Sequence, residues 1–396
     1  MKKTLILILC LLVVPWCLFA GGKAVEKATL TVIGPWAGPE MEQFMPVLNA
    51  FEEKENVTVK YRIYRAEDLS SVLPAQFEAS QSPGDVIAMW YWWVMENHGH
   101  AVDLSDIWEP EKDAFTAPQK EAGGKTVMVP FTMVVKPGFW YRQSFFDKHG
   151  LKAPNTWDEF TDLLRKIGDI DGIKAPIATG NGVGWPISDI TEHFLIAIGG
   201  PKLHKNLVSK SIRWTDPEVR QIFENNIVPL LSAGAFSDPI EWTQAVELWW
   251  GGEYGIYFMG NWITGMVKDP NDLGVFSLPG AKAVVGGADY FFIPKYSENV
   301  DLAKKLLAFM ISKEGLSIRA EQGGKLVVRN DVSVSRYPEA DRNLAEVVSK
   351  MEETTIPDMD DTIGGDWQRL FWDQLKLLWV EPDSLDDVLR KLQAGL

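Results

Sequence analysis

The order of the predicted strands and helices near the N-terminus limits the fold more than any other feature of this chain. Apolar residues run together or alternate, as in strands, over residues 29–33, 57–63 and 85–89, and they recur at helical spacing over 39–54 and 68–80. A β-α-β-α-β order predicts a parallel sheet with right-handed crossovers. The sequence therefore predicts a fold of the α/β class.

Composition narrows the class of partner. The 396 residues carry a formal net charge of −15 at pH 7. Because nucleic acid and anionic lipid are both bound through clustered Lys and Arg, this acidic balance argues against either as a partner. The length favours two domains and is sufficient to bury large cores.

The N-terminus has the pattern of an export signal. Lys2 and Lys3 precede an apolar run from Leu5 to Val14, and Ala20 offers a small residue for cleavage. Residues 1–20 are therefore predicted to be a signal peptide. The apolar run is too short for a comfortable transmembrane helix. We expect a periplasmic or extracellular protein.

Both cysteines, Cys10 and Cys17, lie inside this predicted signal. Cleavage after Ala20 would leave a mature chain without cysteine, which excludes disulfides and thiol chemistry. Lipid attachment at Cys17 is the alternative. The preceding residues Val14-Pro15-Trp16 fit the usual small-residue lipobox poorly, so we do not favour it.

The chain contains 17 tryptophans, and several of them directly follow predicted strands. Trp36 follows the first strand, and the run Trp90-Tyr91-Trp92-Trp93 follows the third. In open α/β sheets, ligands bind beyond the carboxyl ends of the strands, so these aromatics belong to the edge where a ligand would lie. An indole face stacks on the C–H face of a pyranose while polar groups bind the hydroxyl rim. The sequence thus predicts a sugar site.

Five short stretches, in order along the chain, carry a resemblance to a known family. They are Pro83-Gly84-Asp85-Val86; the segment from Trp140-Tyr141-Arg142 to Thr156-Trp157-Asp158-Glu159-Phe160; Gly252 to Trp262; Leu278-Pro279-Gly280 to Gly286-Gly287; and Ala303 to Gly323 with Lys325-Leu326-Val327-Val328-Arg329. Together they resemble the extracellular solute-binding proteins of carbohydrate ABC importers, the group similar to maltose receptors. Val327 departs from the pattern, because the family usually has a proline two residues before the basic residue.

The resemblance implies a two-lobe periplasmic binding protein fold with a hinge and a ligand cleft between the lobes. It implies a lobe one formed by residues 25–135 and 273–328, and a lobe two formed by residues 136–272 and 329–396. The ligand would lie between the lobes and close them about the hinge. Periodicity by itself predicts only the parallel α/β units.

Aromatic residues from both implied lobes are the candidates for stacking on a ligand: Trp36, Trp90, Tyr91, Trp92, Trp185, Trp262 and Trp367. Trp262 matches a family position whose indole stacks on sugar, Trp185 lies in a glycine-rich loop, and Trp367 resembles a C-terminal aromatic of lobe two. Because consecutive strand residues face opposite sides, the four aromatics at 90–93 cannot all enter one core. The alternative for each candidate is an ordinary place in the core.

Sugar hydroxyls both donate and accept hydrogen bonds, so carboxylates, amides and arginine are useful partners. Asp289 and Arg329 are the polar candidates, and Gly287 is expected to let backbone approach the ligand. The alternatives are a surface or structural ion pair for the two charged residues and an ordinary turn for the glycine.

The function expected from the resemblance is a receptor that binds a carbohydrate, with a di- or oligosaccharide favoured, and delivers it to the membrane permease subunits of an ABC importer. We expect a monomer without catalytic residues, cofactor or metal. His98 and His100 lack a third metal ligand at a recognisable spacing.

Two alternatives to a carbohydrate receptor remain open on the sequence. A secreted glycoside hydrolase would need two carboxylates across a sugar site, and acidic residues are plentiful. The same receptor fold would also suit a polyamine, bound by aromatics and carboxylates, or a polyol phosphate, bound by arginines or helix N-termini.

Overall fold

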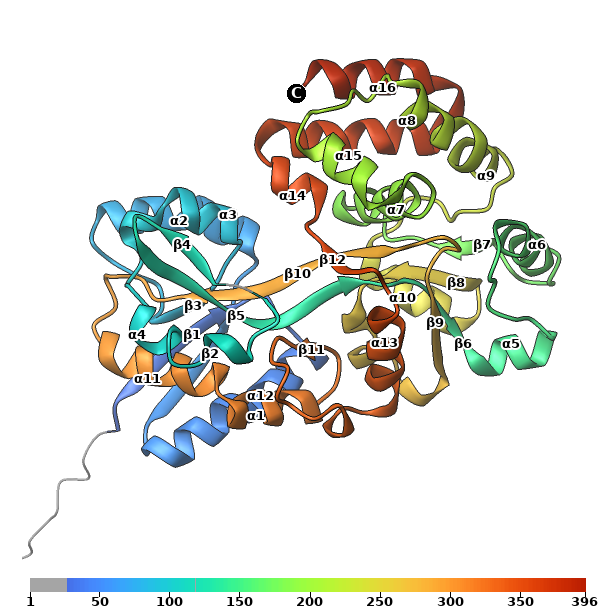
Figure 1. Cartoon of the computed structure of the whole chain (residues 1–396). Coiled ribbons are helices and arrows are strands. Elements are labelled where there is room, and N and C mark those ends of the chain that lie inside the picture. Colours follow the sequence, from blue (N-terminus) through green and yellow to red (C-terminus); the bar gives the residue numbers. More distant parts are fainter. Residues whose placement is uncertain (1–26, 118) are drawn as a thin grey trace, which may run out of the picture.

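The computed structural model describes residues 27–117 and 119–396. The predicted signal peptide, with Cys17, lies outside the described residues. Within the described part, no helix combines the length and the apolar character that crossing a membrane requires. The chain is built around two β-sheets that carry helices on their faces (Figure 1).

The larger sheet confirms the predicted β-α-β-α-β unit. Strands β1 (Thr29–Gly34), β2 (Thr58–Ile63) and β3 (Val86–Ala88) are parallel, and α1 (Pro39–Glu55) and α2 (Ala66–Glu78) form the crossovers. The sheet as a whole is mixed, because β10 (Ala283–Phe292) runs antiparallel between β3 and β5 (Lys125–Lys136). Three short strands complete it: β4 (Lys120–Ala122) and β11 (Leu326–Val327) on β5, and β12 (Glu353–Ile356) on β10.

Both faces of the larger sheet are covered, and side-chain alternation explains how. Val32 and Val86 point into a core shared with α1, α11 (Val300–Ile311) and α12 (Lys313–Glu321). Ile33 and Ile87 point into a second core with α2 and α3 (Tyr91–Glu96). The short α4 (Ser105–Trp108) packs against β5 and α11.

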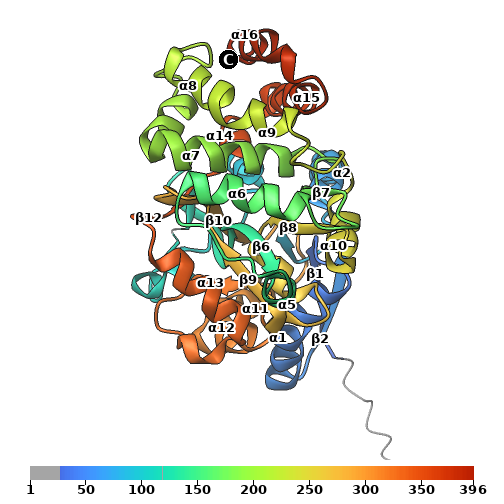
Figure 2. The same cartoon turned by 90° about the vertical axis from the view of Figure 1, so that its right-hand side faces the viewer.

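The smaller sheet has the order β7 (Ala175–Ala178), β8 (Tyr254–Met259), β6 (Gly138–Arg142), β9 (Leu273–Phe276). Ile256 and Phe258 of β8 face one layer of helices, and Tyr257 and Met259 face the other side. Figure 2 shows these helices stacked around the sheet: α5 (Gln143–His149), α6 (Trp157–Gly168), α7 (Trp185–Val208), α8 (Pro217–Ile222), α9 (Val228–Ser232), α10 (Trp242–Gly251), α13 (Glu339–Ser349), α14 (Met359–Ile363), α15 (Gly365–Val380) and α16 (Leu385–Ala394).

The chain passes between the sheets over a very short connection. Strand β5 ends at Lys136 and β6 begins at Gly138. Gly138 has a φ of 132°, and a Cβ there would lie 2.4 Å from the carbonyl oxygen of Phe276, so glycine is required. One continuous cluster of buried apolar side chains includes Val129 of β5 and Tyr257 of β8, so the two sheets share a core.

Strand pairing bears on the predicted lobe boundaries. β9 begins at Leu273 and is hydrogen-bonded to β6 in the smaller sheet, whereas the prediction assigns residues 273–328 to lobe one. β12 pairs with β10 in the larger sheet, whereas the prediction assigns residues 329–396 to lobe two. We propose boundaries that follow the pairing: lobe one is the larger sheet with its helices, and lobe two is the smaller sheet with its helices, α14 included.

Candidate ligand-binding site

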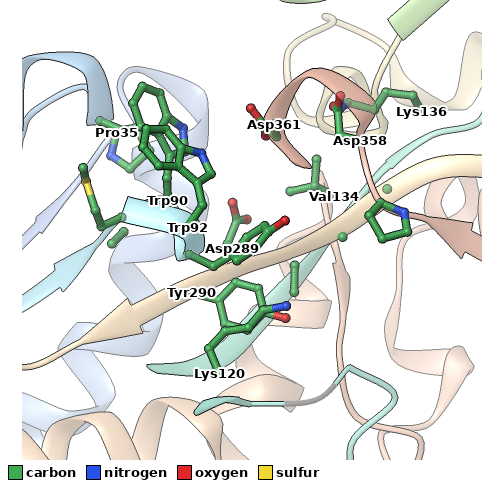
Figure 3. Close-up of a pocket in the computed structure, with 18 residues that line it drawn as sticks. Pro35, Trp90, Trp92, Lys120, Val134, Lys136, Asp289, Tyr290, Asp358 and Asp361 are labelled. Atoms are coloured by element: carbon green, nitrogen blue, oxygen red, sulfur yellow. The ribbon is translucent and has the colours of Figure 1, made fainter. Parts of the chain in front are cut away.

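A pocket of about 360 Å³ lies between lobe one and the α14 segment of lobe two (Figure 3). It is lined by residues at the junction of β3 and α3, by the middle of β10 and by the segment from Pro357 to Asp361. Its volume falls in the range of small-molecule sites. The pocket lies beyond the carboxyl end of β3, where ligands bind in open α/β sheets.

The lobe-one side of the pocket is an aromatic wall made of Trp90, Tyr91, Trp92 and Tyr290. The rings of Trp90 and Trp92 are stacked, with centroids 5.2 Å apart and an interplanar angle of 19°. The predicted candidates Trp90, Tyr91 and Trp92 all line the pocket, and Trp93 is buried in the core instead. Trp93 points away from its three neighbours because α3 begins at Tyr91. The side-chain directions therefore follow a helical turn and not the alternation of a strand.

Two further predicted residues lie on the floor of the pocket, in β10. Asp289 Oδ2 accepts hydrogen bonds from Thr132 Oγ1 at 2.6 Å and from Lys325 Nζ at 2.9 Å. Gly287 is exposed to the pocket, with open space where a Cβ would stand. Its neighbour Gly286 is the glycine that packing requires, because a Cβ there would lie 2.6 Å from the carbonyl oxygen of Val134.

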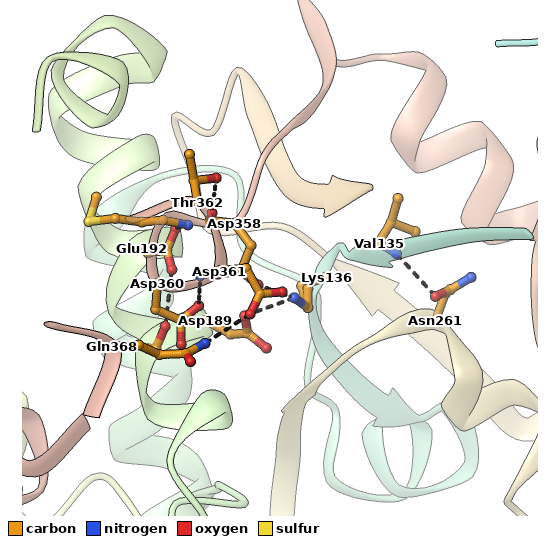
Figure 4. Close-up of polar contacts among 12 residues, drawn as sticks. Val135, Lys136, Asp189, Glu192, Asn261, Asp358, Asp360, Asp361, Thr362 and Gln368 are labelled. Atoms are coloured by element: carbon orange, nitrogen blue, oxygen red, sulfur yellow. Dashed lines mark hydrogen bonds and ion pairs between the residues drawn. The ribbon is translucent and has the colours of Figure 1, made fainter. Parts of the chain in front are cut away.

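The opposite side of the pocket is a charged wall made of Lys136, Asp358 and Asp361. Lys136 Nζ lies 2.5 Å from Asp358 Oδ2 and 3.0 Å from Asp189 Oδ1 of α7 (Figure 4). Asp361 Oδ1 accepts a hydrogen bond from Gln368 Nε2 at 2.9 Å. Lys136 belongs to the end of β5, so this ion pair joins the strand that leaves lobe one to two helices of lobe two.

Three more carboxyl groups lie behind the charged wall: Asp189, Glu192 and Asp360. Glu192 Oε2 lies 2.6 Å from His204 Nε2 and accepts a hydrogen bond from the backbone N–H of Met359 at 2.9 Å. Trp372 Nε1 donates to Asp360. Burial raises the pKa of each of these three carboxyl groups.

Asp358 behaves differently from its neighbours because of Lys136. Burial alone would raise the pKa of Asp358, but the attraction of Lys136 and the hydrogen bonds from Lys136, Asp360 and Glu192 together outweigh it and lower that pKa below its ordinary value. Burial likewise opposes the charge on Lys136, yet Asp189 and Asp358 raise the pKa of the ammonium. Lys136 and Asp358 therefore form a buried ion pair, and behind it lie three carboxyl groups whose pKa values burial raises.

Carboxylate oxygens of Asp189, Glu192 and Asp358 all lie within 4.8 Å of one another, which is a spacing that a metal ion could use. The ammonium of Lys136 already contacts two of these three residues. A buried cation beside buried carboxylates removes the need for a metal charge. We therefore assign this cluster to an internal ion pair.

Trp36, Trp185 and Trp262 do not line the pocket. The ammonium of Lys325 lies 5.3 Å from the ring centroid of Trp36, in lobe one, and 5.9 Å from that of Trp262, in lobe two. Trp185 packs edge-on against Trp262 at 5.7 Å. Trp36 and Trp262 are only 5% and 8% exposed and Trp185 is half-buried, so we call these three residues with Lys325 the sealed cluster between the lobes.

Two predicted site residues, Arg329 and Trp367, lie away from the pocket. The guanidinium of Arg329 is buried and donates to Asp331, to Glu111 and to the carbonyl of Ile311. This is the structural ion pair that the sequence left open.

Trp367 is 5% exposed in the core of lobe two, where its ring stacks on Phe371 at 4.7 Å. Its Nε1 donates to the carbonyl of Leu392 at 3.2 Å. An indole whose face and N–H are both taken by the protein has nothing to offer a ligand. Neither Arg329 nor Trp367 reaches the pocket.

Sequence reasoning missed four charged residues of the pocket: Lys120, Lys136, Asp358 and Asp361. Lys120 and Lys136 bracket the strand pair β4–β5, and the two aspartates follow the last crossing between the sheets. The one available signal was the acidic stretch Pro357-Asp358-Met359-Asp360-Asp361. That stretch alone does not reveal the charged wall, because the cation that pairs with Asp358, Lys136, lies more than two hundred residues away in the chain.

A family profile described as bacterial extracellular solute-binding protein matches residues 37–316. The chain belongs to this family. An uncharacterized ABC transporter extracellular-binding protein of Pyrococcus horikoshii is 51% identical over 380 residues, covering 93% of this chain and 89% of that protein. The alpha-glucosides-binding periplasmic protein AglE of Rhizobium meliloti is 23% identical over 76% of this chain and 69% of its own length.

The fold agrees with solved members of the group. The bacterial solute receptor AcbH, described as having an exclusive preference for β-D-galactopyranose, superposes with a TM-score of 0.83 at 18% identity. The superposition covers 93% of this chain and 98% of that receptor. The two-lobe fold predicted from the sequence is confirmed. The relatives are transporter binding proteins, and the family is extracellular.

Proposed function

We propose that this protein captures a carbohydrate between its two lobes and delivers it to the permease subunits of an ABC importer. The observation that carries the proposal is the pocket between the aromatic wall of lobe one and the charged wall, whose two aspartates come from lobe two. The names given to two of the similar proteins, alpha-glucosides for AglE and a galactopyranose for AcbH, support a sugar as the ligand. We further propose that residues 1–20 direct export and are then removed.

The walls suit the two kinds of surface that a sugar presents. The stacked indoles of Trp90 and Trp92 and the rings of Tyr91 and Tyr290 offer flat apolar faces for pyranose C–H bonds. Asp289 and Asp361 offer acceptors for hydroxyl groups. A ligand that touches both walls is bound better when the lobes are together, and this difference is what shifts the protein towards its closed state.

The glycosidase alternative is not favoured by the acids of the pocket. A general acid in such an enzyme needs a raised pKa and an unengaged carboxyl group. The pKa of Asp358 is lowered by Lys136, and Asp289 is held by Lys325 and Thr132. The polyamine and polyol-phosphate alternatives keep this same pocket, so they are best separated by titration.

The first experiment is a tryptophan fluorescence titration of the mature chain with mono- and oligosaccharides, spermidine and glycerol phosphate. We expect a saturable change with a sugar and no shorter product by chromatography. Trp92→Ala should weaken binding about tenfold, since an aromatic contact contributes about 1–1.5 kcal/mol. Trp250→Ala, a half-buried tryptophan outside the pocket, is the matched control. A hydrolysed product, or a response only to spermidine or glycerol phosphate, would overturn the proposal.

A further inference from the structure

The charged side chains that line the pocket do not balance within themselves. They are Lys120, Lys136, Asp289, Asp358 and Asp361. Asp289 is neutralised by Lys325 at 2.9 Å, and Asp358 by Lys136 at 2.5 Å. Those two ion pairs belong to the protein, and Asp361 accepts a hydrogen bond from Gln368 Nε2 at 2.9 Å, so Lys120 is the charge of the pocket that a ligand would meet.

Lys120 differs from the other two lysines in what surrounds it. It lies in β4, beside the aromatic wall, and its Nζ stands 4.2 Å from the ring centroid of Tyr91 and 5.1 Å from that of Tyr290 (Figure 3). Among residues 27–117 and 119–396, no carboxylate forms an ion pair with it. Its ammonium is half-buried, and burial lowers its pKa.

A half-buried ammonium on aromatic faces is incompletely compensated. Cation–π contact with two tyrosine rings contributes modestly compared with a charge-assisted hydrogen bond to an anion. Burial disfavours the charged form of the Lys120 ammonium. A carboxylate in the pocket would stabilise that charged form again, because an opposite charge within about 4–6 Å favours it.

From this geometry we propose that the cargo is a carbohydrate bearing a carboxylate, with Lys120 as the residue that selects it. The inference rests on the proposed function and names the class of sugar. The carboxylate lies against Lys120 while the ring stacks on the aromatic wall. Asp361, on the opposite wall, accepts a hydrogen bond from a ligand hydroxyl. This polarity orients the sugar, because a reversed ligand would bring its carboxylate to Asp361.

The test compares sugars that differ only at C6: glucose with glucuronate, galactose with galacturonate, and mannose with mannuronate, joined by galacturonate dimers and trimers and by glucose 6-phosphate. Binding by calorimetry at low and high salt is measured for the mature chain and for Lys120→Met and Lys120→Arg. The methionine keeps the apolar stem of the side chain, and the arginine keeps the charge. Lys125→Met removes an exposed lysine from the same β4–β5 hairpin and is the matched control.

We expect at least one uronate to bind tenfold or more tightly than its neutral partner, with weaker binding at high salt. Lys120→Met should reduce that affinity tenfold or more and change any neutral-sugar affinity less than twofold. Lys120→Arg and Lys125→Met should bind the uronate with an affinity close to that of the parent chain. Tighter binding of neutral sugars, an equal loss for both classes in Lys120→Met, or a preference for the phosphate overturns the inference while leaving the receptor intact. Silence with every sugar, neutral or acidic, overturns the proposed function itself.

Discussion

The two walls of the pocket are built in opposite ways. The aromatic wall comes mainly from three consecutive residues, Trp90 to Trp92, at the junction of β3 and α3. The charged wall comes from Lys136 at the end of β5 and Asp358 before α14, supported by Asp189 on α7. A wall made by a local run can be located from a sequence, whereas a wall assembled from distant segments requires the fold.

The largest effect expected from this comparison is at the centre of the charged wall. Lys136→Met leaves Asp358 and Asp189 buried without their cation, which should lower the free energy of unfolding by about 3–5 kcal/mol. Urea unfolding at neutral pH measures it. Adding Asp358→Asn to that variant should recover part of the loss, because the orphaned charge is gone. A loss below about 1 kcal/mol in Lys136→Met would mean that the ion pair contributes little.

Comparing a tryptophan of the sealed cluster with one of the aromatic wall distinguishes a packing role from a ligand-binding role. Trp262→Ala opens a cavity between the lobes and should cost about 3–5 kcal/mol of stability, whereas Trp92→Ala should lower ligand affinity and affect stability less. Parallel urea unfolding and ligand titration of both variants check this. If Trp262→Ala weakens ligand binding tenfold at unchanged stability, the sealed cluster belongs to the binding site after all.

Acid should lower the free energy of unfolding through His193, a buried histidine on α7, the helix that also carries Asp189. Burial lowers the pKa of His193 to about 3, so the folded state keeps it neutral while the unfolded state takes up a proton below pH 6.5. The stabilisation that depends on neutral His193 is fully present above pH 6.5. As the pH falls from there towards 3, the free energy of unfolding decreases by about 1.4 kcal/mol per pH unit.

His193→Gln should therefore flatten the stability–pH curve on the acid side, measured by urea unfolding at several pH values. The glutamine can still accept from the backbone N–H of Leu278, which lies 3.0 Å from His193 Nε2. His98→Gln, at an exposed histidine, is the control. An unchanged acid slope in His193→Gln would contradict the assignment.

The smallest effect concerns the bond that joins the walls directly. Burial raises the pKa of the Tyr91 hydroxyl of α3, and Thr362 of α14 partly opposes this as a hydrogen-bonding neighbour. Tyr91→Phe should lower the free energy of unfolding by about 0.5–1.5 kcal/mol, the net value of one hydrogen bond. Tyr64→Phe, at another half-buried tyrosine of lobe one, serves for comparison. Equal changes in both variants would indicate that the bond contributes nothing specific.

The sequence predicted the α/β class, the first five elements and the edge of the sheet at which aromatics gather. These rest on periodicity and on strand ends, which are local properties. It could not tell Trp90, which lines the pocket, from Trp36, which follows a strand in the same way but is covered by Phe44, Phe131 and Phe291. Burial of that kind depends on which helix and which distant strand cover the residue.

The two polar candidates, Asp289 and Arg329, also end in different places because of the fold around them. Asp289 reaches the pocket because β10 returns to the middle of the larger sheet, between β3 and β5. Arg329 is drawn into contacts with Glu111 and Asp331 instead. Neither outcome follows from residue type, because both residues are charged and both lie near strands.

The core that runs unbroken from β5 to β8 has a consequence for how the molecule can be divided. Each sheet buries apolar side chains that would face water if the other were absent, as Val129 and Tyr257 illustrate. A fragment that carried one lobe alone would expose that surface and tend to aggregate. The two halves are thus partners in folding as well as in binding, and damage to either is felt by the whole chain.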